Sequence, residues 1–139
     1  MNTKRIGDAS EARVLSALLE RDYPVSVPFG DNDPYDLLVE TSDGVHRVQV
    51  KTGWMEEGRI RFKTASKTTA DGNAVRRDYA PEEVDVFAVR CRETDDCYWV
   101  PFETAGRKNT YLRVDSPKID HPNVRLAEDY RFDTALPPR

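Results

Sequence analysis

Apolar residues recur at helical spacing near the start of the chain. Those that share one side of the predicted helix are Ala12, Leu15, Leu18 and Leu19. We predict a helix that opens at Asp8 as its N-cap and ends before Pro24. Glu11 follows Asp8 by three positions, as in a capping box, and also lies on the apolar side. The sequence leaves two roles open for its carboxylate, a cap or a site residue.

The strongest hairpin signal lies between residues 35–41 and 45–51. Both segments carry apolar side chains, and they flank Ser42-Asp43-Gly44, a sequence typical of a tight β-turn. If the turn is centred on its Asp-Gly pair, Asp36 lies opposite Lys51 on the neighbouring strand. Oppositely charged cross-strand pairs favour such a register.

The same register places Glu40 opposite Arg47. Because side chains alternate along a strand, Gln49 and Lys51 share one side, and the neighbouring valines point toward the core. Asp36, Gln49 and Lys51 then bring an acid, an amide and an ammonium group together, a set that suits a metal-dependent hydrolase. The alternative is a set of ordinary surface pairs, which are common in sheets and contribute little to stability.

The remaining pattern predicts further strands. Basic and apolar residues alternate at 59–63, after a strand break at 52–54 and a turn at 56–58. An apolar strand at 84–89 should be central in the sheet. The other expected segments are a partner strand at 97–101, short ordered pieces at 111–114 and 124–127, a loop at 64–73 and a frayed tail at 134–139.

Composition limits the number of domains and the class of protein. The 139 residues, 38% of them hydrophobic, suit a single domain spanning 1–139, with a core at about 7–132. No apolar run is long enough for a membrane span, and no signal peptide opens the chain, so we expect a cytoplasmic protein. With so few cysteines, Cys91 and Cys97 are expected to be free thiols.

Charge is unevenly distributed along the chain. Residues 47–77 include eight basic and three acidic residues, a net charge of +5, whereas the whole chain carries −4. A cationic face on an otherwise anionic protein indicates a DNA-binding protein, and the acidic remainder suggests adaptation to a salty, halophilic cytoplasm.

The motifs resemble the PD-(D/E)xK nuclease superfamily, in which a helix carrying an acid precedes such a hairpin. The pattern appears here as Pro34-Tyr35-Asp36 and Gln49-Val50-Lys51, with Gln49 where Asp or Glu is commoner. The later segments, through Ala127-Glu128-Asp129-Tyr130, resemble the branch of group I intron-associated homing endonucleases, which accepts Gln at this position. The resemblance extends from about Gly7 to Phe132. It implies an α/β fold with a restriction-endonuclease-like mixed β-sheet core, one main N-terminal helix and additional β-hairpins.

The resemblance also implies roles for individual residues. Asp36 would be the main metal-binding carboxylate, completed by the Gln49 side chain, the Val50 backbone carbonyl and Glu11. Lys51 would orient or activate the attacking water. The expected ion is Mg²⁺, with Mn²⁺ as a substitute and no organic cofactor.

We therefore expect a Mg²⁺-dependent endodeoxyribonuclease that acts as a homodimer or homotetramer, since each chain holds one centre. Two alternatives stay open: a Holliday-junction resolvase that acts on branched DNA, and an inactive DNA-binding or assembly protein in which Gln49 marks lost catalysis. The residues expected to contact DNA, mostly its phosphates, are Arg59, Arg61, Lys63, Lys67, Arg76 and Arg77.

Overall fold

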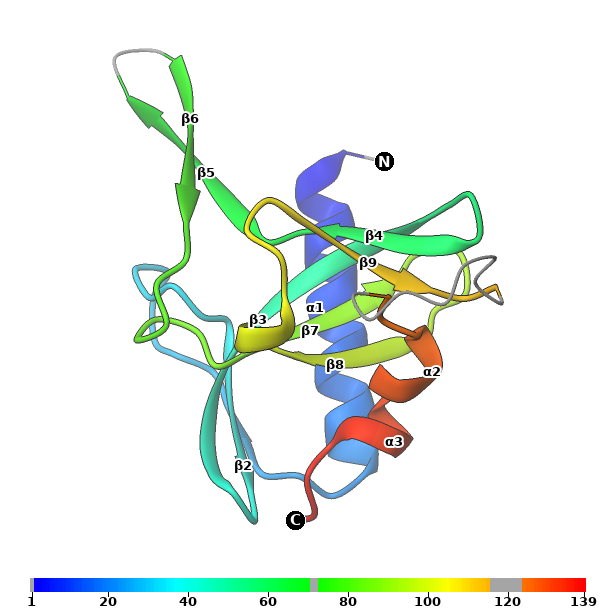
Figure 1. The fold of residues 1–139 in the computed structure, drawn as a ribbon. Coiled ribbons are helices and arrows are strands. Elements are labelled where there is room, and N and C mark those ends of the chain that lie inside the picture. The colour runs from blue at the N-terminus through cyan, green and yellow to red at the C-terminus, as the bar shows by residue number, and fades with distance from the viewer. Residues whose placement is uncertain (1, 71–72, 116–123) are drawn as a thin grey trace.

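A long helix lies across one face of a mixed β-sheet (Figure 1). The structure, a computed structural model, describes the backbone of residues 2–70, 73–115 and 124–139, and the side chains of these residues outside 66–77. Within these residues, α1 (Thr3–Glu20) is the longest helix. None of the helices described is long and apolar enough to cross a membrane.

Helix α1 begins six residues earlier than predicted, nearly two turns. Asn2 is its N-cap and accepts a hydrogen bond from the Arg5 backbone N–H at 2.9 Å, whereas Asp8, the predicted cap, lies inside the helix. The buried residues are Ile6, Ser10, Val14, Ala17 and Leu18. The predicted apolar side is therefore wrong in part: Leu18 is buried but Leu19 is 52% exposed, because the packed face follows positions 6, 10, 14 and 18. The helix ends before Pro24, as predicted.

Strand β3 (Gly44–Glu56) organises the sheet. It pairs antiparallel with β2 and β4 and parallel with β7, so the predicted mixed sheet is confirmed. β7 lies between β3 and β8, which confirms the central position predicted for this segment. The other strands of this sheet are β1 (Val25–Ser26), β2 (Leu37–Thr41), β4 (Arg59–Lys63), β7 (Val86–Cys91), β8 (Cys97–Pro101) and β9 (Asn109–Arg113).

The predicted break within β3 is wrong, because the strand continues through Gly53 to pair with β4. A Cβ atom on Gly53 would lie 2.6 Å from Ile60 Cγ2 and 3.0 Å from Val89 Cγ1. Glycine here allows a close approach between packed strands, so it is not a sign that the strand ends. The turn after β3 falls at residues 56–58, as predicted.

The β2–β3 register differs from the predicted one by two residues. Leu38 lies opposite Arg47 and Glu40 opposite Val45, so both predicted ion pairs, Glu40 with Arg47 and Asp36 with Lys51, are wrong. The turn uses Ser42 and Asp43 as its two connecting residues, and Thr41 pairs with Gly44. A shift of two residues keeps every side chain on its expected face.

Two hydrophobic clusters hold the layers together. One joins α1 to the sheet and includes Val14, Leu18 and Val48. The other includes Phe62, Phe87 and Leu112 and packs against Ala127 of the short helix α2 (Ala127–Tyr130). Cys91 and Cys97 are buried free thiols, one in each cluster, as expected.

A loop was predicted at 64–73, but residues 65–70 and residue 73 belong to a second, two-stranded sheet; residues 71–72 lie outside the described residues. β5 (Ala65–Ala70) pairs with β6 (Asn73–Asp78), and Figure 1 shows this hairpin extending away from the main sheet. The threonines of this segment favour a strand, but they lie among alanine, serine and lysine with no large apolar residue, so local propensity gave only a weak strand signal here.

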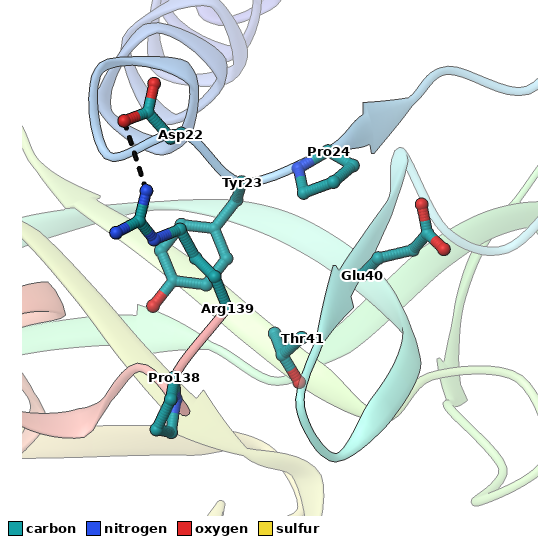
Figure 2. Close-up of a pocket in the computed structure, with 7 residues that line it drawn as sticks. All are labelled: Asp22, Tyr23, Pro24, Glu40, Thr41, Pro138 and Arg139. Carbon is teal, nitrogen blue, oxygen red and sulfur yellow. Dashed lines mark hydrogen bonds and ion pairs between the residues drawn. The ribbon is translucent and has the colours of Figure 1, made fainter.

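The C-terminal segment is docked, contrary to the predicted frayed tail. After η1 (Phe102–Thr104), α2 and α3 (Phe132–Ala135), the chain returns to the end of α1 and to the β2–β3 turn. Tyr23 Oη donates to the Pro137 carbonyl at 2.5 Å, and Ser42 N–H donates to the Pro138 carbonyl at 2.7 Å. Figure 2 shows the ion pair of Arg139 with Asp22, at 3.1 Å, beside these contacts.

Candidate active site

Residues predicted for the site come together where β2 begins. Asp36 immediately precedes β2, and its N–H donates to the Val48 carbonyl at 2.8 Å. Its carboxylate Oδ2 accepts a hydrogen bond from the Val50 N–H at 2.9 Å. These two bonds hold the Asp36 side chain beside the segment Gln49–Lys51, although Asp36 is not the cross-strand partner of Lys51.

Two carboxylates at this place influence each other. Burial raises the pKa of Asp36, while the Val50 hydrogen bond and the Lys51 charge act in the opposite direction. Burial also raises the pKa of Glu11, with further contributions from the charges of Asp36 and Asp8. Glu11 therefore lies within electrostatic range of Asp36, and the pair would be stabilised by an added cation.

Lys51 is held against an aromatic side chain. Burial lowers the pKa of Lys51 to about 8, and the charge of Asp36 opposes this change. Its Nζ donates a hydrogen bond to Tyr79 Oη at 3.0 Å and lies 4.9 Å from the centre of the Tyr79 ring. The same ring packs edge-on against Phe87, 5.7 Å between centres. Sequence reasoning missed Tyr79, since no motif links it to a lysine so far away in the chain.

The donor set at this place fits a hard divalent ion. Glu11 and Asp36 would offer carboxylate oxygens, Gln49 an amide oxygen and Val50 a backbone carbonyl. The Gln49 amide nitrogen faces the Val50 carbonyl at 3.5 Å, the outer limit of a hydrogen bond. Across residues 2–70, 73–115 and 124–139, no group of three His, Cys, Asp or Glu side chains could hold a metal. An ion here would depend on the amide and carbonyl oxygens as well.

Two further interactions fix the elements that carry the site. Ser10 Oγ and Thr52 Oγ1 lie 2.6 Å apart, and they are the chain neighbours of Glu11 and Lys51. This contact joins α1 to β3 at the level of the site, with Ser10 only 1% exposed. A hydroxyl on the buried side of a helix is the only sequence signal that could have revealed it.

The second interaction joins β3 to β7 through one ion pair. Asp85 accepts three hydrogen bonds from Arg47, from its backbone N–H at 2.7 Å, its Nε at 3.0 Å and its Nη2 at 2.9 Å. The Asp85 N–H in turn donates to the Arg47 carbonyl at 2.8 Å. These bonds hold the strand that carries Gln49 and Lys51 beside the central strand of the sheet.

The residues predicted to contact DNA are only partly described. Arg61 Nε pairs with Glu56 at 3.0 Å, the Arg59 guanidinium stacks on the Tyr111 ring at 4.1 Å, and the Lys63 side chain is exposed. Lys67, Arg76 and Arg77 lie on the β5–β6 hairpin, and their side chains fall outside the described residues.

The acid-bearing helix, the hairpin and its lysine define a nuclease of the PD-(D/E)xK type. The chain matches the PD-(D/E)XK endonuclease family over residues 1–133 and belongs to that family. It is therefore an endonuclease with DNA as its substrate, of a class that generally uses divalent metals.

The fold is similar to that of a solved bacterial homing endonuclease, I-Ssp6803I. The TM-score is 0.77 with 23% sequence identity, and the match covers 96% of this chain and 90% of that chain. The predicted fold and the predicted resemblance are both confirmed. No curated protein matches the chain in sequence.

Proposed function

We propose that the protein is a Mg²⁺-dependent endodeoxyribonuclease of the homing type, with its centre at Glu11, Asp36, Gln49 and Lys51. The observation that carries this proposal is the convergence of two carboxylates of raised pKa and a half-buried lysine of lowered pKa beside the β2–β3 hairpin. Groups whose charged forms are disfavoured in the free protein are typical of active sites.

The metal-binding residues in this proposal are Asp36 and Glu11 through carboxylate oxygens, Gln49 through its amide oxygen and Val50 through its carbonyl. A divalent ion, when bound, supplies Lewis acidity toward water and the phosphate. Gln49 must present its oxygen, so the amide has to turn from the orientation in which its nitrogen faces Val50. Because Gln carries no charge, we expect metal binding without DNA to be weak, and Mn²⁺ should substitute for Mg²⁺.

Lys51 has two tasks in this proposal. Its ammonium group donates hydrogen bonds to the attacking water or to a phosphate oxygen, which offsets the charge that develops during hydrolysis. Tyr79 holds Nζ in place through the 3.0 Å hydrogen bond, so the long side chain does not have to be ordered during the reaction. The partly buried surroundings strengthen the interaction of Lys51 with an anion.

We also propose that two or four identical chains act together. Each chain provides one centre, and cutting both strands of a duplex requires two. Arg59, Arg61, Lys63, Lys67, Arg76 and Arg77 would contact mainly phosphates. Light scattering of the purified protein should give the mass of a dimer or tetramer; a monomer with or without DNA contradicts this part.

Plasmid cleavage tests the activity. Supercoiled DNA should be nicked or linearised with Mg²⁺ and remain intact with EDTA, at low and at high KCl. Asp36→Asn should remove cleavage while DNA affinity, measured by fluorescence anisotropy in EDTA, stays within about threefold of wild type. Cleavage that persists in Asp36→Asn would refute the assigned centre. Preferential cutting of four-way junctions over linear duplexes would instead favour a resolvase.

A further inference from the structure

A cleft leads away from Lys51 between the first turns of α1 and strands β3 and β4. It measures about 550 Å³, and its walls include Gly7, Lys51, Trp54, Arg61 and Lys63. Three of its lining residues are cationic and none is acidic. The cleft beside the docked tail, by contrast, has Asp22 and Glu40 in its wall (Figure 2). In a chain of net charge −4, such a cationic wall favours a polyanion.

Gly7 forms an open part of this wall inside helix α1. It is exposed, and a Cβ atom built on it would meet nothing within 4 Å. Glycine is among the least favourable residues in a helix interior, so its presence here has no explanation in the packing of the free chain. Gly7 precedes Glu11 by four positions and shares its side of the helix. A ligand at Glu11 could therefore continue along the helix surface across Gly7.

Trp54 provides an apolar surface on the opposite wall. It is 39% exposed, and the Arg92 guanidinium lies 5.4 Å from its ring centre. The sequence contains two tryptophans, and the other, Trp99, is 2% exposed. A ligand that enters this cleft therefore meets an aromatic face together with cations.

We propose that the cleft binds the sugar-phosphate backbone of the DNA strand on one side of the cut bond. Phosphates contact Lys63 and Arg61, a deoxyribose packs against Trp54, and the strand passes close to the helix at Gly7. Arg61 uses Nε for Glu56 and has further N–H donors for a phosphate. This inference rests on the proposed function for the direction of the strand, because Lys51 lines the cleft and Glu11 lies one helical turn from Gly7.

A charge placed at Gly7 tests the cleft directly. Gly7→Glu should weaken binding of a fluorescein-labelled DNA duplex at least tenfold, measured by anisotropy in EDTA at low salt. The matched control is Ala9→Glu, which adds the same charge to an exposed position on the other side of α1. It should change the affinity less than twofold. Equal losses in both variants, or no loss in either, would overturn the proposal.

Tryptophan fluorescence gives an independent readout that does not depend on Gly7. Titration with the same duplex should quench the wild-type emission, and the change should be absent in Trp54→Phe, which retains the buried Trp99. A quench of unchanged size in Trp54→Phe would contradict a strand beside Trp54. The Gly7→Glu variant should melt at or above the wild-type temperature, because Glu is a better helix former than Gly and has free space here.

Cleavage assays on the same proteins separate this inference from the proposed function. A wild-type protein that binds DNA but never cleaves it with Mg²⁺ would end the nuclease proposal. The affinity difference between Gly7→Glu and Ala9→Glu would still show whether DNA binds in the cleft. A protein that cleaves DNA while Gly7→Glu binds it as tightly as wild type would end the cleft proposal alone.

Discussion

Strand β3 carries the basic residues of two acid–base pairs, Arg47 with Asp85 and Lys51 with Asp36, and the two pairs differ in how their charges are satisfied. In the first pair, Arg47 gives three hydrogen bonds to Asp85, and the pKa of Asp85 is lowered mainly by the hydrogen bond from Arg47. In the second pair, burial is the largest influence on both groups: it raises the pKa of Asp36 and lowers the pKa of Lys51. The first pair stabilises its charged forms, whereas the second holds charges that the folded chain disfavours.

We propose that the difference separates a structural ion pair from the charged groups of an active site. Arg47 and Asp85 satisfy each other, so they tie β3 to β7 without needing a ligand. Among the described residues, the Asp36 side chain accepts one hydrogen bond, from Val50, and the Lys51 ammonium donates one, to Tyr79. Asp36 keeps acceptors that a metal ion can use, and Lys51 keeps donors that a phosphate can use. Stability and activity should therefore respond in opposite ways to changes at the two pairs.

The largest expected effect comes from removing the Lys51 charge. Lys51→Met should reduce the rate of plasmid cleavage by about 10²- to 10⁴-fold, because no ammonium remains to act on the water or phosphate. The melting temperature should not fall, since Met keeps the apolar stem and removes a buried charge. Rates under single-turnover conditions and thermal melts measure the two effects.

The matched change at the structural pair is Asp85→Asn. It removes the charged acceptor of Arg47, so the melting temperature should fall, while the folded protein cleaves within a few-fold of wild type. If Asp85→Asn abolished cleavage in the folded protein, or if Lys51→Met were the less stable variant, the distinction between the two pairs would be wrong.

The sequence revealed which face of the hairpin carries polar groups but not its register. Alternation survives a shift of two residues, so Gln49 and Lys51 fall on the predicted side even though Glu40 and Arg47 are not partners. The true partner of Arg47 is Asp85, on a strand distant in sequence. The pattern of neighbouring residues does not reveal a pair between distant segments, and the contact of Tyr79 with Lys51 was missed for the same reason.

Glycine and polar residues misled the prediction for physical reasons. Gly53 signals a break by propensity, but its role is the close contact with Ile60 and Val89. The tail at 134–139 reads as unstructured because its contacts, with Tyr23 and Ser42, are made to residues far away in the chain. The predictions that held are the existence of helix α1, which rests on helical periodicity, and the central strand β7, which rests on a continuous apolar run.

A smaller effect than the loss of cleavage in Lys51→Met is the pH dependence of stability in the metal-free protein. The pKa of Lys51 is about 8 in the folded chain against an ordinary value of 10.5, so the unfolded chain binds more protons between these values. The contribution of Lys51 therefore raises the free energy of unfolding as pH rises from 8 to 10.5, and below pH 8 its full cost of roughly 3 kcal/mol is present. The raised pKa values of Cys97 and Tyr98 act in the opposite direction in this range, but they act in wild type and in Lys51→Met alike. The free energy of unfolding of wild type, measured by urea unfolding in EDTA, should therefore rise relative to that of Lys51→Met between pH 8 and 10.5. Parallel curves for the two proteins would contradict the burial of Lys51.

The smallest effect should come from the hydroxyl that holds Lys51. Tyr79→Phe removes the 3.0 Å hydrogen bond but keeps the ring beside Nζ and against Phe87. Loss of one such bond, about 1 kcal/mol, should lower kcat roughly fivefold and leave KM for DNA unchanged. Tyr23→Phe is the control, since it also loses a hydroxyl bond, to Pro137, but far from the site, and should affect only the melting temperature. An unchanged kcat in Tyr79→Phe would show that Lys51 is positioned by its burial alone, and a raised KM would assign Tyr79 to DNA binding.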